Sequence, residues 1–120
     1  MRALFDSNVL IDYLKGIAAA RNEIALYESR SISIITWMEV LAGAAEPAQL
    51  ETQAFLDSFI TIGISNKIAL RAVKLREELR LKLPEAVIFA TALEQGLLLV
   101  TRNTEDFAAN SPSVRIPYLL

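Results

Sequence analysis

Short apolar runs alternate with longer amphipathic stretches along this 120-residue chain. The apolar runs lack the polar alternation of a half-exposed strand, and continuous runs of this kind are typical of strands covered on both faces. Between them, hydrophobic positions recur three and four residues apart, as on one face of a helix. The expected strands are residues 2–5, 31–35, 60–64, 97–100 and 113–116. The expected helices are residues 7–15, 18–29, 37–45, 48–59, 66–81 and 85–95.

This alternation predicts an α/β sandwich with a mainly parallel sheet of four to five strands. The length suits a single domain over residues 1–120. Several helix ends have local signals. Thr36 and Glu39 have the spacing of a capping box that opens the helix 37–45. Pro47 and Pro84 suit first turns, and Gly96 suits a helix end.

Within the predicted helix 66–81, four apolar residues recur at helical spacing. We expect all four to face the core. They are Ile68, Ala72, Leu75 and Leu79.

Composition narrows the chemistry that this chain can perform. It is 53% hydrophobic and 22% charged, which excludes intrinsic disorder. It has no Cys and no His, so thiol nucleophiles, imidazole bases and histidine-bound zinc are excluded. The formal charge of -2 gives no overall basic surface for nucleic acid, although a local one is compatible with it.

The amino-terminal residues have no secretory pattern, because Asp6 interrupts the apolar run at once. The longest uncharged run, residues 58–66, is too short to span a bilayer. We therefore expect a cytoplasmic protein without a membrane segment.

Four acidic residues fall near strand–helix junctions: Asp6, Glu39, Glu85 and Asp106. In parallel sheets, ligand sites form along the carboxyl edge of the strands. Four carboxylates gathered there repel each other, and a divalent cation relieves that repulsion. An all-oxygen ligand set suits Mg²⁺ or Mn²⁺.

A purely structural interpretation is also open. Acids at helix starts complement the helix dipole by a few tenths to ~1 kcal/mol each, and Asp6 and Asp106 also suit N-caps. The neighbouring polar residues favour a site, because they share the same junctions. They are Ser7, Asn8, Thr101 and Asn103.

Four segments of the chain together resemble the PIN-domain family, and within it the VapC-type toxins of toxin–antitoxin pairs. The segments are residues 5–12 (FDSNVLID), 34–40 (IITWMEV) with Gly43, 83–88 (LPEAVI) with residues 90–92, and 99–107 (LVTRNTEDF). They occur in the family's order and span most of the chain.

The resemblance implies a three-layer α/β/α sandwich and a Mg²⁺- or Mn²⁺-dependent endoribonuclease. It implies an RNA substrate, a cognate antitoxin protein and a homodimer. Asp6, Glu39 and Asp106 match the family's acidic positions, and Asn103 matches a polar residue near the metal. Thr101 matches the hydroxyl that orients the acids, with Ser7 and Asn8 beside it.

Glu85 departs from the family pattern, in which Asp is usual at this position. The added methylene moves the carboxylate by about 1.5 Å on an unchanged backbone, a displacement that matters for reacting groups. Three outcomes follow: direct metal contact through another rotamer, contact through water, or a weakened nuclease. The last is the alternative function, a PIN-like RNA-binding or interaction module.

Half of the 12 basic residues lie within residues 67–82, directly before Pro84 and Glu85. They favour a rim that contacts RNA phosphates, although a solvated helix face has the same pattern. The proposed RNA contacts are Arg76, Arg80, Lys82 and Arg102.

The aromatic residues are spaced as core or partner contacts rather than as base-stacking platforms. An apolar groove between the early helices is expected to receive an antitoxin helix. Its predicted lining residues are Val9, Leu10, Tyr13, Leu14, Trp37 and Leu41.

Other enzyme classes fit the sequence less well. A dehalogenase-like phosphatase needs a second Asp two residues after the first, and Asn8 stands there. A receiver domain needs a further acidic pair at the first strand and a late Lys, and a Rossmann domain needs a glycine-rich turn. None of these features is present in the sequence.

Overall fold

A computed structural model describes residues 2–108 and 110–120. Five parallel strands form one sheet in the order β3-β2-β1-β4-β5. The strands are β1 (Arg2–Phe5), β2 (Ser29–Ser33), β3 (Ile60–Ile62), β4 (Leu98–Val100) and β5 (Val114–Arg115). The α/β class, the parallel pairing and the number of strands confirm the prediction.

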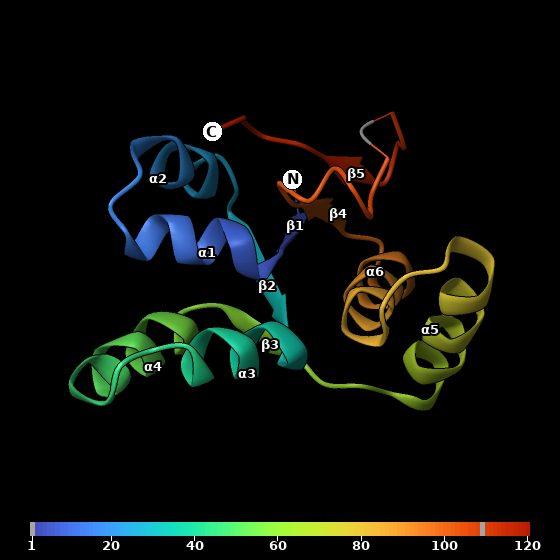
Figure 1. Ribbon diagram of the computed structural model, residues 1–120, viewed down its shortest axis with the longest axis horizontal. Helices are drawn as coiled ribbons and strands as arrows, with labels where there is room; N and C mark the ends of the chain where they lie inside the picture. The colour runs from blue at the N-terminus through green and yellow to red at the C-terminus, as the bar shows by residue number, and fades with distance from the viewer. Residues whose placement is uncertain (1, 109) are drawn as a thin grey trace.

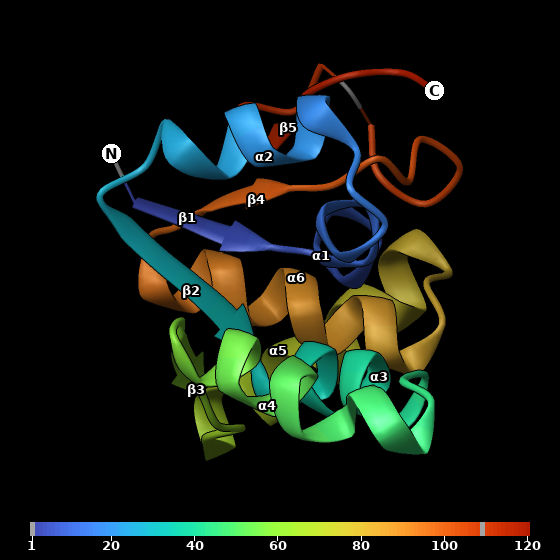
Figure 2. The ribbon, with the colours of Figure 1, turned by 90° about the vertical axis from the view of Figure 1, so that its left-hand side faces the viewer.

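Helices cover both faces of this sheet, which completes three layers (Figures 1 and 2). They are α1 (Ser7–Leu14), α2 (Ala18–Ala25), α3 (Ile34–Ala42), α4 (Gln49–Asp57), α5 (Asn66–Leu79) and α6 (Leu83–Gln95), with a 3₁₀ turn, η1, over Glu46–Ala48. In Figure 1, α5 and α6 lie on one side of the sheet and α1 to α4 on the other.

The core is divided between the two faces of the sheet because successive residues of a strand point to opposite faces. Leu4 of β1 packs with the residues of α5 and α6, and its neighbours Ala3 and Phe5 pack with those of α1, α2 and α4. Both faces of the central strand are therefore apolar, as the continuous hydrophobic run predicts. None of the helices in the described ranges is long and apolar enough to cross a membrane.

The start of α3 differs from the prediction. The helix begins at Ile34, three residues before the predicted 37, and Ser33 is its N-cap, with its hydroxyl accepting from the Ile35 amide at 3.1 Å. The capping box at Thr36 and Glu39 is wrong, because Thr36 lies inside the helix and is fully buried. Glu39 is consequently one turn further along the helix than predicted.

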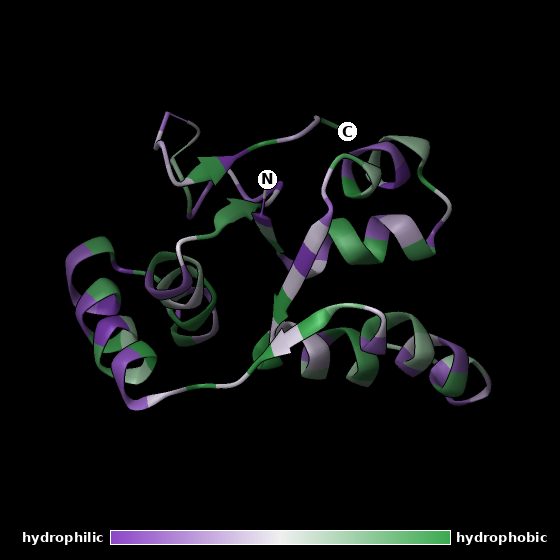
Figure 3. Ribbon diagram, turned by 180° about the vertical axis from the view of Figure 1, so that it is seen from behind, coloured by the Kyte–Doolittle hydropathy of each residue, from purple (hydrophilic) through white to green (hydrophobic). Residues whose placement is uncertain are grey.

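The other helix ends agree more closely. Pro47 and Pro84 occupy first-turn positions, and Gly96 ends α6 with φ of +64°. In α5, Ile68, Ala72 and Leu75 are buried, but Leu79 is 50% exposed, so its predicted core position is wrong. Leu79 is the last residue of α5, directly before the left-handed C-cap residue Arg80. Figure 3 shows hydrophilic and hydrophobic residues alternating along this outer helix.

Candidate active site

Asp6 lies where β1 ends, at the carboxyl edge of the sheet. Its amide donates to the carbonyl of Val100 at 2.9 Å, which joins it to the end of β4. It is the N-cap of α1, and its Oδ1 accepts from the Ser7 amide at 2.8 Å. Asp6 therefore does cap α1, as the purely structural interpretation expects. Capping uses only Oδ1, and the second carboxylate oxygen, Oδ2, has other partners.

Thr101 and Asn8 hold that second oxygen. The Thr101 hydroxyl donates to Oδ2 of Asp6 at 2.7 Å, and Nδ2 of Asn8 lies 3.3 Å from the same oxygen. The Thr101 oxygen also accepts from the Asn103 amide at 3.0 Å and lies 3.2 Å from Nδ2 of Asn8. Residues from the ends of two adjacent strands thus fix the orientation of one carboxylate.

The surroundings of Asp6 disfavour the negatively charged form of its carboxylate. Burial raises the pKa of Asp6 above its ordinary value of 3.8, and the hydrogen bonds from Thr101 and the Ser7 amide oppose that rise. The negative charges of Glu39 and Glu85 raise the pKa of Asp6 further. These two acids are therefore close enough to Asp6 to act on it, and a cation placed among the three relieves the repulsion.

Glu39 reaches this region from α3. Its Oε1 accepts from the Ser7 hydroxyl at 2.8 Å, so Ser7 joins Asp6 through its amide to Glu39 through its side chain. Glu39 is exposed to solvent, unlike Asp6. The arrangement gives the site one open carboxylate and one buried one.

Glu85 enters from the first turn of α6, whose amino end meets the same edge of the sheet. Its Oε2 is buried and has no hydrogen-bond partner among the described residues. A buried acceptor without a partner costs about 1–3 kcal/mol. The charge of Glu85 also acts on Asp6, so this buried oxygen without a partner fits a site for a hard cation.

Asp106 is held by Asn103. Asn103 Nδ2 donates to Asp106 Oδ2 at 2.8 Å, and the Asp106 amide donates to Asn103 Oδ1 at 3.1 Å, which closes a turn. Asp106 also lines a cavity of about 250 Å³ beside Leu79 and Phe89. Asn103 in turn donates its amide to the Thr101 hydroxyl oxygen, and the Thr101 hydroxyl donates to Asp6. Asp106 is therefore joined to Asp6 through Asn103 and Thr101.

Across residues 2–108 and 110–120, no three acidic side chains are spaced to hold a metal ion between them. This does not conflict with a magnesium site, because Mg²⁺ is usually held by one or two carboxylates and keeps several waters. Asp6 and Glu85 supply two carboxylates, and every donor around them is oxygen or a neutral amide. The residues present thus fit a hydrated dication better than a closed protein cage.

Two buried acids were not predicted as important, Asp12 and Glu23. Asp12 accepts from Nε and a terminal nitrogen of Arg102, at 2.5 and 3.1 Å. Glu23 accepts in the same forked manner from Arg115, at 2.6 and 3.0 Å. Helical spacing is the signal that points to Glu23, because it lies on the same face of α2 as the buried Ala20 and Ile24.

The predicted RNA contacts have different surroundings. Arg76, Arg80 and Lys82 line one open hollow of about 320 Å³, and none has a carboxylate within salt-bridge distance in the described part of the chain. The guanidinium of Arg102 is instead paired with Asp12. The three exposed cations form the basic patch.

The apolar groove is lined by partly different residues from those predicted. Val9 and Leu10 are fully buried and cannot line it. A groove of about 250 Å³ does run between α1, α3 and α4, directly beside Glu39. Its apolar walls include Ile11, Leu14 and Val40. Helix α1 turns Ile11 and Leu14, rather than Val9 and Leu10, toward solvent.

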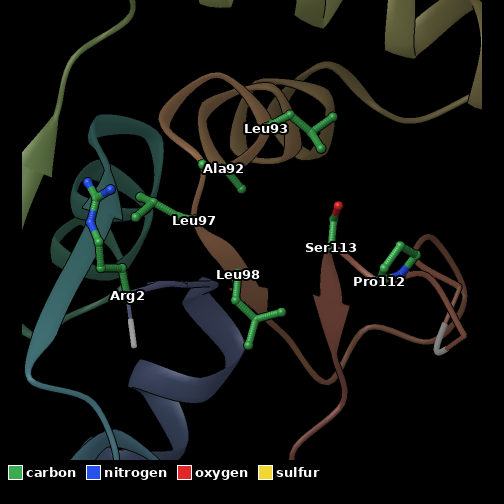
Figure 4. A pocket seen from close by; sticks show the side chains of 8 residues that line it. Arg2, Ala92, Leu93, Leu97, Leu98, Pro112 and Ser113 are labelled. Atoms are coloured by element: carbon green, nitrogen blue, oxygen red, sulfur yellow. The ribbon is translucent and has the colours of Figure 1, made fainter.

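A further cavity lies elsewhere. It has a volume of about 630 Å³ and opens at the amino ends of β1 and β4, where Arg2 and Leu98 begin those strands (Figure 4). Among the described residues that line it, Arg2 alone is ionisable. The cavity therefore offers no acid–base chemistry, and the candidate active site is at the opposite edge of the sheet.

Known proteins share both the sequence pattern and this architecture. The family model of the PIN domain matches residues 3–111. Ribonuclease VapC10 of Mycobacterium tuberculosis is 32% identical over 112 residues, covering 87% of this chain and 84% of that protein. A toxin-antitoxin complex from Klebsiella pneumoniae contains a chain that is 47% identical, with a TM-score of 0.92 over 98% of this chain and 99% of that one.

A more distant structure has the same fold. FitAcB from Neisseria gonorrhoeae has a TM-score of 0.80 at 22% identity, covering 98% of this chain and 99% of that one. The family match spans most of the chain, and the first two relatives exceed 30% identity over most of its length. The chain belongs to the PIN-domain family, among the VapC-type toxins.

Proposed function

We propose that this protein is a Mg²⁺- or Mn²⁺-dependent endoribonuclease and the toxin of a toxin–antitoxin pair. The observation that carries this proposal is the buried Asp6 carboxylate, on which the charges of Glu39 and Glu85 act. In the described part of the chain, no cationic side chain lies within salt-bridge distance of Asp6. The name of its relative ribonuclease VapC10 supports RNA as the substrate. Its cytoplasmic location and its function as one domain over residues 1–120 belong to the same proposal.

In this proposal Asp6 and Glu85 hold the dication, and Glu39 completes the open side of the site. A bound dication would neutralise charge on the scissile phosphate and lower the pKa of an attacking water. Thr101 and Asn8 keep the Asp6 carboxylate in one orientation, and Ser7 does the same for Glu39. Asp106 and Asn103 contribute through water, from the turn that they close together.

RNA approaches across the basic patch, which leads along the chain into Pro84 and Glu85. Exposed cations that contact phosphates supply affinity without choosing a sequence. We propose that Arg76, Arg80 and Lys82 make these contacts, with Arg102 as a further contact through the guanidinium nitrogen that does not bond to Asp12.

The antitoxin occupies the groove between α1, α3 and α4 in this proposal, and the protein acts as a homodimer. The groove is apolar and ends at Glu39, so a helix lying in it would cover the open side of the site. The relative from Klebsiella pneumoniae is described as a toxin-antitoxin complex, which supports such a partner.

The test is RNA cleavage by the purified protein with Mg²⁺, with Mn²⁺ or with a chelator. Asp6→Ala removes the central carboxylate, and we expect it to abolish cleavage while the circular dichroism spectrum stays that of the wild type. Glu51→Ala is the matched control, because it removes an exposed carboxylate from α4. Undiminished cleavage by Asp6→Ala, or cleavage in the chelator, would refute the proposal.

Failure of the wild type to cleave would favour the alternative, a PIN-like interaction module that has lost catalysis at Glu85. Glu85→Asp separates the two cases, because Asp is usual at this position in the family that the sequence resembles. Cleavage that appears only in Glu85→Asp would assign the loss to the added methylene.

A further inference from the structure

Three side chains from distant parts of the chain meet behind the candidate active site. Asp12 of α1 accepts from the forked guanidinium of Arg102 and, at 2.7 Å, from the hydroxyl of Tyr118. The Asp12 side chain is 4% exposed, and the Arg102 guanidinium lies 5.9 Å from the centre of the Tyr118 ring. Asp12, Arg102 and Tyr118 together are called the anchor.

The anchor is joined to Asp6 by a chain of hydrogen bonds. The backbone amide of Arg102 donates to Oδ1 of Asn8 at 3.0 Å. An Asn side chain whose oxygen is engaged in this way must direct its NH₂ group to the other side. That group lies 3.3 Å from Oδ2 of Asp6 and 3.2 Å from the Thr101 hydroxyl oxygen.

The position of Arg102 therefore decides which way Asn8 faces. Arg102 also lies between Thr101 and Asn103 in the chain. The Thr101 hydroxyl donates to Asp6, and the Asn103 amide donates to the Thr101 hydroxyl oxygen. Backbone hydrogen bonds also hold the turn over residues 101–103, from the Thr101 amide to the Arg115 carbonyl at 3.1 Å and from the Phe107 amide to the Asn103 carbonyl at 3.2 Å. The ion pair to Asp12 is the contact that fixes the Arg102 side chain. A bidentate Arg–carboxylate pair supplies both energy and fixed geometry.

We propose that Asp12, Arg102 and Tyr118 are positioning residues, which hold the 101–103 turn so that Asn8 and Thr101 keep the Asp6 carboxylate in its working orientation. This inference rests on the proposed function, in which Asp6 holds the dication. It makes Tyr118, near the carboxyl end of the chain, part of the support of a site at the end of the first strand.

The protein contains a matched control for this proposal. Glu23, Arg115 and Tyr27 form a second assembly of the same chemistry, in which a buried carboxylate accepts from a forked Arg and a Tyr hydroxyl. Its side chains make no hydrogen bond to Asp6, Asn8 or Thr101 in the described residues, although the backbone carbonyl of Arg115 accepts from the Thr101 amide at 3.1 Å. Tyr27→Phe leaves this backbone contact in place, so it reproduces the loss of one Tyr hydroxyl without removing a contact to the site.

The test compares Tyr118→Phe and Arg102→Lys with Tyr27→Phe. Tyr118→Phe removes one hydroxyl and keeps the ring, and Arg102→Lys keeps the charge and removes the fork. We expect both to shift the Asn8 side-chain amide signals in a ¹⁵N NMR spectrum and to lower kcat for RNA cleavage about 10-fold or more, with little change in KM. Tyr27→Phe should leave the Asn8 signals and kcat unchanged.

The NMR measurement needs no enzymatic activity, so it decides this inference even where the proposed function fails. If folded Tyr118→Phe and Arg102→Lys proteins keep the wild-type Asn8 signals, the inference is overturned. If those signals move but kcat falls equally in Tyr27→Phe, the effect is general destabilisation and the positioning role is likewise rejected. A rise in KM with unchanged kcat for Arg102→Lys would assign Arg102 to RNA binding instead.

Discussion

Individual buried acids in this protein fall into two kinds. Asp12 and Glu23 each accept a forked Arg and a Tyr hydroxyl, so their charge is balanced where it is buried. Asp6 is just as buried but accepts from neutral donors alone and faces two further carboxylates. Unbalanced buried charge opposes folding, and such groups cluster at functional sites.

The buried charge of Asp6 should lower the free energy of unfolding of the wild type. Because its folded pKa is raised above 3.8, its contribution to stability is complete below that pH and is lost as the pH rises through the folded pKa. In a chelator, we expect Asp6→Asn to have a higher free energy of unfolding than the wild type at pH 7. The difference should shrink as the pH falls toward 3.8.

Urea unfolding of both proteins across this pH range measures the effect. Asp57→Asn serves as the control, since Asp57 is exposed and bonded to the Trp37 indole at the surface. An advantage of Asp6→Asn that stays constant or grows toward low pH would contradict the assignment of a raised pKa.

At the scale of the helices, the carboxyl ends of α5 and α6 share an unusual backbone conformation. Both α5 and α6 finish with a residue in the left-handed region, Arg80 at φ 56° and Gly96 at φ +64°. Gly adopts this conformation without strain, whereas a residue with a Cβ pays roughly 1–2 kcal/mol. Arg80 is thus a strained helix end that also belongs to the basic patch, and such strain is typically retained where a side chain serves a function.

This contrast yields a prediction for the two helix ends. Arg80→Gly should raise the free energy of unfolding by about 1 kcal/mol and weaken RNA binding. Gly96→Ala should lower the free energy of unfolding by about 1 kcal/mol. The cost at Gly96 is one of backbone conformation, because an added Cβ there would meet no atom within 4 Å. Denaturant unfolding checks the stabilities.

RNA binding at several salt concentrations checks the second part of that prediction. Arg80→Glu should weaken binding and flatten its dependence on salt, because a phosphate contact releases a counterion. Lys67→Glu, at the far end of α5, is the control. Equal losses in the two variants would assign the effect to net charge rather than to the basic patch.

At the scale of the whole molecule, the parallel sheet determines which residues meet. Strands β1, β2 and β4 run in one direction, so Asp6, the start of α3 and Thr101 all arrive at one edge. Helix α6 runs back against them, which brings Glu85 to the same edge from its amino end. The candidate site is therefore a product of topology, assembled from four segments that are distant along the chain.

A dication that joins these segments should stabilise the entire fold. Metal bound only by the native state adds about 2.7 kcal/mol at a free concentration 100 times its Kd. We therefore expect Mn²⁺ to raise the Tm of the wild type and of Glu51→Ala, and to leave the Tm of Asp6→Ala unchanged. Differential scanning calorimetry with Mn²⁺ and with Ca²⁺ measures this, and an equal rise in Asp6→Ala would place the metal elsewhere.

Much of the fold was predictable because it depends on local pattern. Continuous apolar strands and helical periodicity follow from burial on two faces or one, and they gave the element order correctly. The start of α3 was missed because two hydroxyl residues, Ser33 and Thr36, both suit an N-cap. Packing decided between them: Thr36 is buried inside the helix, and Ser33 stands at the end of β2.

The sequence by itself determined that polar and acidic residues follow the strands, and that any metal among them would have oxygen ligands. Only the tertiary structure decided which acids remain unbalanced. Asp12 meets Arg102 across 90 positions of sequence, whereas Asp6 meets no cationic side chain in the described residues. The reason is physical: charge interactions and hydrogen bonds depend on distance in space, which sequence spacing does not specify until the sheet has ordered its strands.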